Sequence, residues 1–317
     1  MITHRPANGT AGAAACLLCT TPSDAKVRGR FAPSPTGRMH LGNVYAALLS
    51  YVSAKSQGGE WLLRIEDIDT QRSKTEWAER LMDDLDWLGL GWDGDVVWQS
   101  RRFGLYETML GRLDALGLLY PCRCTRQELA TASAPHAADG HAVYNGRCRM
   151  APRRAAEGLD GQTLRLMVPP LPAERPWPDG ATDIQAFDDA ICGPQRLQLS
   201  AEWGDFVVRR RDGAWAYQFC AAVDDALTGI TEIVRGDDLL RSTAPQRYVQ
   251  ALLRLPRPSR YAHIPLLLAD DGRRLSKRDA SLAMDVLRSQ WTATDLIARI
   301  CGLCGLDADR VLALAGR

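Results

Sequence analysis

The sequence lacks both a strong net charge and a long apolar run. Its 317 residues carry 39 Lys and Arg against 38 Asp and Glu, so the formal net charge is only +1. No overall positive field therefore indicates nucleic-acid binding, and such a partner must be argued from local basic clusters. No apolar stretch approaches the roughly 20 residues that a membrane span needs, so we expect no membrane partner.

The chain also lacks the cysteine pattern of a small secreted protein. Its nine cysteines are odd in number and scattered, which favours reduced thiols and metal ligation over a disulfide framework. The overall composition, with 46% hydrophobic and 24% charged residues, is typical of an ordinary globular protein. The length allows one large domain with an insertion, or two domains.

One stretch organises the chain, the segment RFAPSPTGRMHLGN from Arg30 to Asn43. It joins a short apolar run, predicted as the first strand, to an apolar-periodic run over 41–54, predicted as the first helix. The prolines and the glycine impose a turn between them. His40 and Gly42 lie where this helix begins, and a helix N-terminus favours anions, above all phosphate. For the His-x-Gly element alone, a turn with an incidental histidine would be the better interpretation.

The whole segment resembles the first signature of class I aminoacyl-tRNA synthetases, and its Ala-Pro-Ser-Pro-Thr-Gly portion resembles the glutamyl branch of that class. The second signature of the class is expected far downstream, where Arg274-Leu275-Ser276-Lys277-Arg278 fits it. The resemblance implies catalytic roles for His40 and Lys277, with Lys277 neutralising charge as the α-phosphate is attacked. It also implies an ATP site, with Mg²⁺ as the counter-ion, at His40, Gly42, Asn43, Ser276 and Lys277.

The same resemblance implies a glutamate pocket, formed by Arg30, Ser34, Glu66, Tyr217 and Arg235. This set is chemically sensible because glutamate carries two carboxylates and one ammonium group, which call for guanidinium groups, a hydroxyl and an acid. Which arginine takes the side-chain carboxylate stays open, and a salt bridge from Arg235 to Asp237 or Asp238 is the alternative. Asp224 and Asp225 are expected to cap a helix or bond within a loop rather than to hold a metal.

Three thiols, at Cys122, Cys124 and Cys148, suit a zinc knuckle, which normally needs four ligands. From chemistry alone His141 would be the fourth, since imidazole is the commoner ligand. The resemblance implies Tyr144 instead, through the Tyr-x-x-x-Cys element of the family; His141 stays the rival, and free cysteines are the alternative to any metal. The zinc would be structural, closing a loop too poor in apolar residues to pack by itself. Arginines cluster around these cysteines and suit a phosphate backbone, although a solvated basic face explains them equally.

The expected fold class is α/β: a Rossmann-like nucleotide-binding domain of the class I synthetase type, with an inserted zinc-containing α+β subdomain of the acceptor type. Alternating strands and helices support a parallel sheet, and Glu66 follows a predicted strand over 61–65, at the sheet edge where ligands usually bind. Asp212-Gly213 predicts a hairpin turn into Trp215 to Phe219. The chain also predicts helices over 75–90 and 101–116 and from about 284 and 292.

These elements predict five divisions of the chain. They are a disordered extension over 1–26 with a C-x-x-C pair of unassigned role at Cys16 and Cys19, the first half of the nucleotide-binding domain over 27–121, the inserted subdomain over 122–205, the second half over 206–255, and a signature-loop region with a short helical tail over 256–317.

The resemblance covers roughly residues 27 to 295 and is to the short relatives in the glutamyl branch, the glutamyl-Q tRNA(Asp) synthetases. Only 40 residues follow Lys277, so no anticodon-binding domain of the usual size is expected there. That family activates glutamate with ATP and attaches it to queuosine, a modified base at the anticodon wobble position of tRNA(Asp). The resemblance therefore implies tRNA(Asp), glutamate and ATP as partners, and we expect a cytoplasmic monomer.

Three alternatives stay open. The chain is a short glutamyl-tRNA synthetase that charges the acceptor end, a small nucleotidyltransferase that uses no tRNA, or a catalytically inactive, zinc-stabilised RNA-binding protein. The missing anticodon-binding domain disfavours the first, the second signature disfavours the second, and intact His40 and Lys277 disfavour the third.

Overall fold

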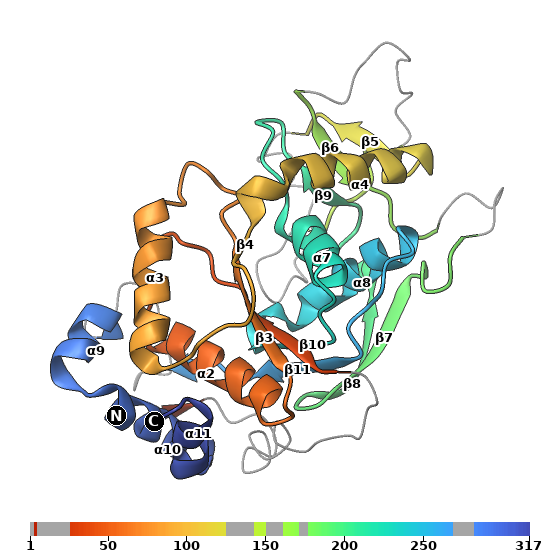
Figure 1. Ribbon diagram of the computed structural model, residues 1–317. Coiled ribbons are helices and arrows are strands. Elements are labelled where there is room, and N and C mark those ends of the chain that lie inside the picture. Colours follow the sequence, from red (N-terminus) through yellow and green to blue (C-terminus); the bar gives the residue numbers. More distant parts are fainter. Residues whose placement is uncertain (1–2, 5–25, 125–142, 150–160, 171–176, 269–281) are drawn as a thin grey trace.

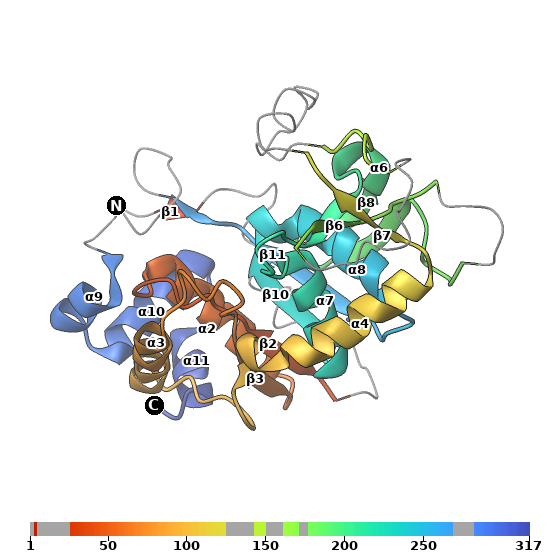
Figure 2. The same ribbon diagram turned by 90° about the horizontal axis from the view of Figure 1, so that it is seen from above.

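The computed structural model describes residues 3–4, 26–124, 143–149, 161–170, 177–268 and 282–317. The predictions for Cys16 and Cys19, for His141 and for the second signature with Ser276 and Lys277 lie outside these ranges. Figures 1 and 2 show a central sheet with helices packed around it, and a smaller sheet farther along the molecule that includes β5, β6 and β9.

The central sheet is assembled from two parts of the chain that are far apart in sequence. Its strands are β2 (Arg28–Phe31), β3 (Glu60–Ile65) and β4 (Val97–Trp98) from the first part, and β7 (Ile184–Asp189), β10 (Glu232–Gly236) and β11 (Arg260–Ile264) from the second. Within each part these strands pair in parallel, in the orders β2-β3-β4 and β10-β11-β7. The parts meet where β2 lies beside β10, and the Thr231 N–H donates to the Arg28 carbonyl oxygen at 2.9 Å. At such a switch point ligands bind outside the carboxyl ends of the strands.

The helix α2 (Leu41–Lys55) follows β2 and packs on β2, β3 and β10. Eleven of its 15 residues are buried, which explains why its sequence is an almost continuous apolar run rather than an amphipathic pattern. The predictions of a first strand and of a helix over 41–54 are confirmed.

Helix α3 (Thr75–Leu88) instead shows an amphipathic pattern. It buries Leu81, Leu85 and Leu88 on one face and ends at Gly89, whose φ of 75° is the left-handed conformation that closes many helices. The helix predicted over 101–116 begins later, because the 3₁₀ turn η2 (Gln99–Arg102) precedes α4 (Phe103–Ala115).

The smaller sheet is antiparallel and contains β5 (Leu119–Cys122), β6 (Thr163–Leu166) and β9 (Phe206–Arg209). It shares an apolar core with α4, α7 (Tyr217–Leu227) and α8 (Thr243–Leu252). The β7–β8 hairpin, with β8 at Gly193–Gln198, falls within the insert predicted over 122–205, yet β7 pairs with β11 of the central sheet. The strand pairing thus assigns part of that segment to the nucleotide-binding sheet.

The hairpin predicted at Asp212-Gly213 is wrong in its second arm. Gly213 does form the turn, with a φ of 83°. The pairing beyond it is a single bridge between Arg209 and Trp215, and the chain then enters α7 at Tyr217. The reason is burial: α7 carries apolar side chains such as Phe219 and Val223, one helical turn apart, into the core that it shares with α8.

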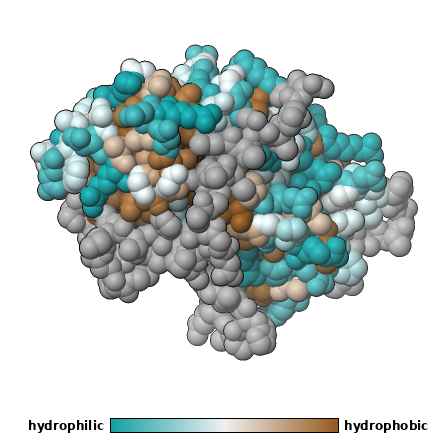
Figure 3. Space-filling view, turned by 90° about the horizontal axis from the view of Figure 1, so that it is seen from below, coloured by the Kyte–Doolittle hydropathy of each residue, from teal (hydrophilic) through white to brown (hydrophobic). Residues whose placement is uncertain are grey.

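Three helices end the chain: α9 (Met284–Gln290), α10 (Ala293–Cys304) and α11 (Ala308–Leu314). The predicted starts near 284 and 292 are confirmed, and the helices pack against α2 and α3 (Figure 1). In the view from below, the largest group of hydrophobic residues lies in the upper left with hydrophilic residues around it, and smaller hydrophobic groups lie elsewhere (Figure 3). Within the described ranges no helix is long and apolar enough to cross a membrane.

Four short elements complete the described fold. They are β1 (Thr3–His4), which pairs with β12 (Leu267–Leu268), the helix α6 (Leu199–Glu202) and the 3₁₀ turn η3 (Asp237–Ser242).

Candidate active site

A cavity of about 750 Å³ opens at the switch point between β2 and β10. All five side chains predicted to hold glutamate line it, together with two of those predicted for ATP: Arg30, Ser34, Glu66, Tyr217, Arg235, Gly42 and Asn43. They come from the carboxyl ends of β2, β3 and β10 and from the first turns of α2 and α7. The fold therefore brings together residues that are up to 205 positions apart in the sequence.

His40 is the N-cap residue just before α2, and its hydrogen bonds fix the tautomer of the neutral ring. The ring Nδ1 of His40 accepts the backbone N–H of Gly42 at 3.1 Å, while the backbone N–H of His40 donates to the Asn43 side-chain oxygen at 3.1 Å. With Nδ1 used as an acceptor, the neutral ring carries its proton on Nε2 and has a donor there. A Cβ on Gly42 would lie 3.0 Å from His40 Cε1, so the glycine makes room for the ring. Imidazole and helix N-terminus together suit an anion.

A buried ion cluster adjoins the cavity, and two of its members, Arg30 and Glu66, line it. Asp225 Oδ1 accepts from Arg64 Nη1 at 2.6 Å and from Arg30 Nε at 3.2 Å. Arg64 also donates to Glu66 at 3.0 Å. The expectation that Asp224 and Asp225 cap a helix or bond within a loop is wrong, because both lie inside α7 and are buried. Asp224 instead accepts from Gln99, Arg102 and Tyr106.

Burial and charge shift the carboxyl pKa values in this cluster in opposite directions. Burial raises the pKa of Glu66, and the pull of Arg64 offsets this only in part. Burial acts on Asp225 in the same sense, but Arg64 and Arg30 together hold the pKa of Asp225 below its usual range. Asp225 is thus the ionised partner of both arginines, and Glu66 gains from any cation that binds next to it.

Arg235 differs from Arg30 and Arg64 because its described hydrogen-bond partners are all neutral. Its Nε donates to His263 Nε2 at 3.0 Å, and its terminal nitrogens donate to Gln246 and Thr243, each at 2.9 Å, and to Tyr217 at 3.4 Å. None of these bonds goes to Asp237 or Asp238, so the alternative of a salt bridge to one of them is not found. A guanidinium that is 5% exposed and lacks a counter-ion among the described residues calls for an anionic ligand.

The three predicted cysteine ligands lie together beside the antiparallel sheet. The sulfurs of Cys122, Cys124 and Cys148 are all within 4.8 Å of one another. The Tyr144 hydroxyl lies among them, 3.7 Å from the Cys122 sulfur and 3.9 Å from the Cys124 sulfur. Three thiols and one phenol that converge in this way fit a zinc ion, because the thiols are soft donors and both kinds of group can bind a metal once deprotonated. His141, the rival ligand, lies outside the described residues.

The backbone around Tyr144 fixes its position in this group. Tyr144 forms a bridge with Gly204, whose φ is 61° and whose added Cβ would collide with the Tyr144 carbonyl oxygen. The Arg165 guanidinium covers the Tyr144 ring at 3.8 Å from its centroid. Burial alone would raise the pKa of Cys148, but hydrogen bonds to its sulfur, first that of Tyr144, lower it to about 7.

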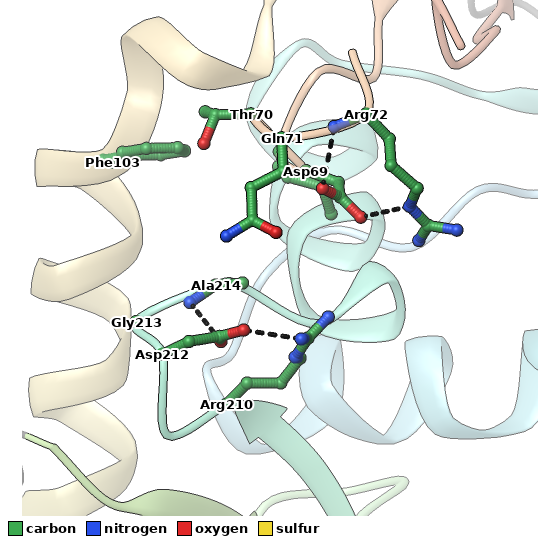
Figure 4. A pocket seen from close by; sticks show the side chains of 10 residues that line it. Asp69, Thr70, Gln71, Arg72, Phe103, Arg210, Asp212, Gly213 and Ala214 are labelled. Carbon is green, nitrogen blue, oxygen red and sulfur yellow. Dashed lines mark hydrogen bonds and ion pairs between the residues drawn. The ribbon is translucent and has the colours of Figure 1, made fainter.

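A second cavity, of about 450 Å³, adjoins the first and shares Asp69, Arg72 and Arg210 with it. Figure 4 shows its two sides: the loop after β3 with Asp69 to Arg72 faces the turn after β9 with Arg210 to Ala214, and Phe103 lies at one end. Asp69 accepts from Arg72 Nε at 2.6 Å, and Asp212 accepts from Arg210 at 2.5 Å. The cavity thus offers two carboxylates, two guanidinium groups and one aromatic ring.

Comparison with known proteins identifies the family. Residues 26–310 match the family model for the catalytic domain of class I tRNA synthetases (E and Q). The chain belongs to this family. A relative from Neisseria meningitidis serogroup C, named glutamyl-Q tRNA(Asp) synthetase, is 45% identical over 262 residues, 83% of this chain and 84% of its own. One of the same name from Cupriavidus metallidurans is 45% identical over 284 residues, 86% of each chain.

Solved structures agree with this family membership. A glutamate tRNA ligase from Elizabethkingia meningosepticum, solved in complex with its amino acid, has a TM-score of 0.64 and 30% identity over 81% of this chain. A glutamate-tRNA synthetase from Elizabethkingia anophelis gives the same values. The chain spans about half the length of these two structures, 53% and 54% respectively.

Some residues of this synthetase-family site were not predicted from the sequence. Arg64, His263 and the anchoring part played by Asp225 emerge only from contacts between elements more than 20 residues apart. Arg64 lies two positions before the predicted site residue Glu66, which was the one local signal. Nothing local marks His263, because its partner Asp189 is 74 positions away.

Proposed function

We propose that this protein activates glutamate with ATP and transfers the glutamyl group to queuosine in tRNA(Asp), in the cytoplasm. The observation that carries the proposal is the convergence of the five glutamate-pocket residues on one cavity, with Arg235 lacking a counter-ion among the described residues. The glutamyl-Q tRNA(Asp) synthetases that match over four fifths of the chain support the choice of substrate and acceptor.

Glutamate would bind through its three charges. Glu66, at the carboxyl end of β3, would bind the ammonium group. The positive charge of this group would offset the cost of burying the Glu66 carboxylate in its ionised form. Arg235 would take one carboxylate because its own charge is uncompensated, and Tyr217 lies within 3.4 Å of it to add a hydroxyl. Arg30, already paired with Asp225, supplies a second positive group to the cavity.

Activation would be an in-line displacement at ATP. An oxygen of the glutamate α-carboxylate forms a bond to the α-phosphorus, and the bond from that phosphorus to pyrophosphate breaks. His40 would donate a hydrogen bond from Nε2 to a phosphate oxygen at the N-terminus of α2. Lys277, in the second signature, would neutralise the charge of the α-phosphate, and Mg²⁺ would accompany the nucleotide. Catalysis would then consist mostly of positioning and charge stabilisation.

The acceptor would enter through the second cavity, because that cavity shares a wall with the first. A hydroxyl oxygen of the queuosine ring forms the ester bond to the glutamyl carbonyl carbon, AMP leaves, and the hydroxyl proton is released. Queuosine carries a secondary amine, which is cationic at neutral pH, so Asp69 and Asp212 suit it, and Phe103 offers an aromatic surface to a base.

A structural zinc ion would fix the loop that carries Cys122, Cys124, Tyr144 and Cys148. Zinc would supply only cross-linking of this loop, and no chemical step passes through it. The nearby Arg147 and Arg149 would then be held on one surface, where they can meet the phosphate backbone of tRNA.

Two assays test the proposal. Wild-type protein is expected to catalyse glutamate-dependent exchange between ATP and pyrophosphate, and to charge tRNA(Asp) that carries queuosine but not tRNA(Asp) that lacks it. Charging of tRNA(Glu) at its acceptor end would support a short glutamyl-tRNA synthetase instead. Absence of any exchange at saturating substrates would contradict the enzyme assignment altogether.

The variant Asp212→Asn separates the two steps. Asp212 lies in the second cavity and outside the first, so we expect transfer to queuosine-containing tRNA(Asp) to fall about tenfold while pyrophosphate exchange stays within twofold of wild type. Asp188→Asn serves as the control, since the Asp188 carboxylate is exposed and lines neither cavity. Equal loss in both steps, or no loss in either, would remove the second cavity from the acceptor path.

A further inference from the structure

A relay of three side chains, Asp189, His263 and Arg235, runs from the protein interior to the candidate glutamate pocket, which only Arg235 lines. Asp189 Oδ2 is 2.6 Å from His263 Nδ1, and His263 Nε2 accepts from Arg235 Nε at 3.0 Å. The Asp189 and His263 side chains are both 0% exposed, and neither lines the cavity. Asp189 comes from β7, His263 from the middle strand β11 and Arg235 from β10, so the relay crosses three neighbouring strands.

The relay has only one consistent arrangement of protons. Arg235 Nε carries a hydrogen at all accessible pH values, so His263 Nε2 must be the acceptor. The neutral ring then carries its proton on Nδ1 and donates it to Asp189. Burial lowers the pKa of His263 to about 4, against the opposing hydrogen bond of Asp189, so the ring is neutral at pH 7.

A neutral ring between the two charges has a consequence for the pocket. Had Asp189 contacted Arg235 directly, its carboxylate would compete with the carboxylate of any ligand. With His263 between them, Arg235 is held at Nε yet keeps an uncompensated charge toward the cavity. Arg30 shows the contrast, because Asp225 contacts its guanidinium directly at 3.2 Å.

We propose that Asp189 and His263 are positioning residues for substrate binding: Asp189 fixes the Nδ1–H tautomer of His263, which aims the Arg235 guanidinium at a ligand carboxylate. This inference rests on the proposed function in naming that carboxylate as glutamate's. The tautomer itself is independent of function, because it follows from the two contacts of the His263 ring alone.

Asp189→Asn is the sharpest test, because the surroundings decide which way the amide faces. Asp189 Oδ1 accepts the backbone N–H groups of Ile191 at 3.0 Å, Cys192 at 2.8 Å and His263 at 3.2 Å. The asparagine oxygen must stay on that side, so its NH₂ faces His263 Nδ1. The ring is then forced to the Nε2–H tautomer, which sets an N–H against Arg235 Nε–H.

We expect Asp189→Asn to raise the KM for glutamate at least tenfold in pyrophosphate exchange, with the KM for ATP changed less than twofold. Asp183→Asn is the matched control: Asp183 also accepts a backbone N–H, from Ser200 at 2.7 Å, in the loop that enters β7, but it contacts no pocket residue. An equal rise in the KM for glutamate in the two variants, or a parallel rise in the KM for ATP, would overturn the proposal.

Two further variants keep the test decisive if Asp189→Asn unfolds. His263→Gln retains a carbonyl oxygen that can accept from Arg235 Nε, whereas His263→Leu has no acceptor. The KM for glutamate should increase in the order wild type, His263→Gln, His263→Leu, and a purely space-filling role of the ring would give the reverse order for the two variants.

The tautomer can be observed without any assay of activity. In protein labelled with ¹⁵N-histidine, the His263 signal, assigned by its loss in His263→Gln, should show a protonated Nδ1 and an unprotonated Nε2. A protonated Nε2 in the wild type would overturn the inference even if glutamate-dependent exchange occurs. Absence of exchange with the expected tautomer would instead count against the proposed function and leave the relay intact.

Discussion

At the scale of single residues, the site is governed by which charges are compensated. Arg64 and Arg30 share Asp225, while Arg235 is held by a phenol, an amide, a hydroxyl and a neutral imidazole. A buried cation without a counter-ion costs free energy until a ligand supplies one. The cost is tolerated where it is used for binding, which supports the proposed role of Arg235 as a ligand group.

The buried neutral histidine gives a pH dependence whose sign follows from its pKa. His263 titrates near pH 4 in the folded protein and near 6.5 when unfolded. Between these values the unfolded chain binds one proton more, so stability falls as the pH falls through this window, by up to about 3 kcal/mol. The groups facing the ring are Asp189 on β7, Arg235 on β10 and Arg30 on β2, and the pKa of Asp189 is lowered, which places its titration below the window.

The prediction is checked by urea unfolding of wild type and His263→Gln at several pH values from 7 to 4. The wild type should lose more stability than the variant across this range. Parallel curves would show that His263 is already solvated or charged in the folded protein.

At the scale of elements, the predictions succeeded where local pattern decides. The run 41–54 is apolar on nearly all sides and is followed by Gly58-Gly59, so a buried helix was predictable. The segment after Gly213 was not, since a hairpin signal competed with the burial of Phe219 and Val223 against α8. Asp225 was misread because its partners lie 161 and 195 positions away, and no local rule can find them.

The loop with the sulfur cluster depends on one glycine that is remote in sequence. Gly204 has a φ of 61° and leaves no room for a Cβ beside Tyr144. We expect Gly204→Ala to displace Tyr144 and to lower the zinc retained per chain, measured after dialysis against a mild chelator. Gly193→Ala is the control, because Gly193 also has a positive φ, of 73°, but nothing lies within 4 Å of its added Cβ. Equal zinc loss from both variants would mean that backbone strain, not contact with Tyr144, is responsible.

At the scale of the whole molecule, the cavity exists only because two distant parts of the chain close one sheet. The strands β2 and β3 come from residues 28–65, and α7 and β10 come from 217–236. Asp225 on α7 joins the two parts by accepting from Arg30 on β2 and Arg64 on β3. Folding of either part alone would leave these charges buried without partners, or exposed along with the apolar faces beside them.

Asp225→Asn should therefore weaken the whole fold rather than the cavity alone. An asparagine keeps the shape but leaves two buried guanidinium groups without their shared carboxylate, and breaking such a buried pair typically costs 3–5 kcal/mol. We expect a loss of about this size in the free energy of unfolding by urea at pH 7, in a single transition that fluorescence and circular dichroism report together. Asp212→Asn, whose exposed carboxylate forms a surface pair with Arg210, should change that free energy by less than about 1 kcal/mol. Two separate transitions in Asp225→Asn would show that the halves fold independently, and a loss as small as that of Asp212→Asn would show that solvent compensates the two arginines.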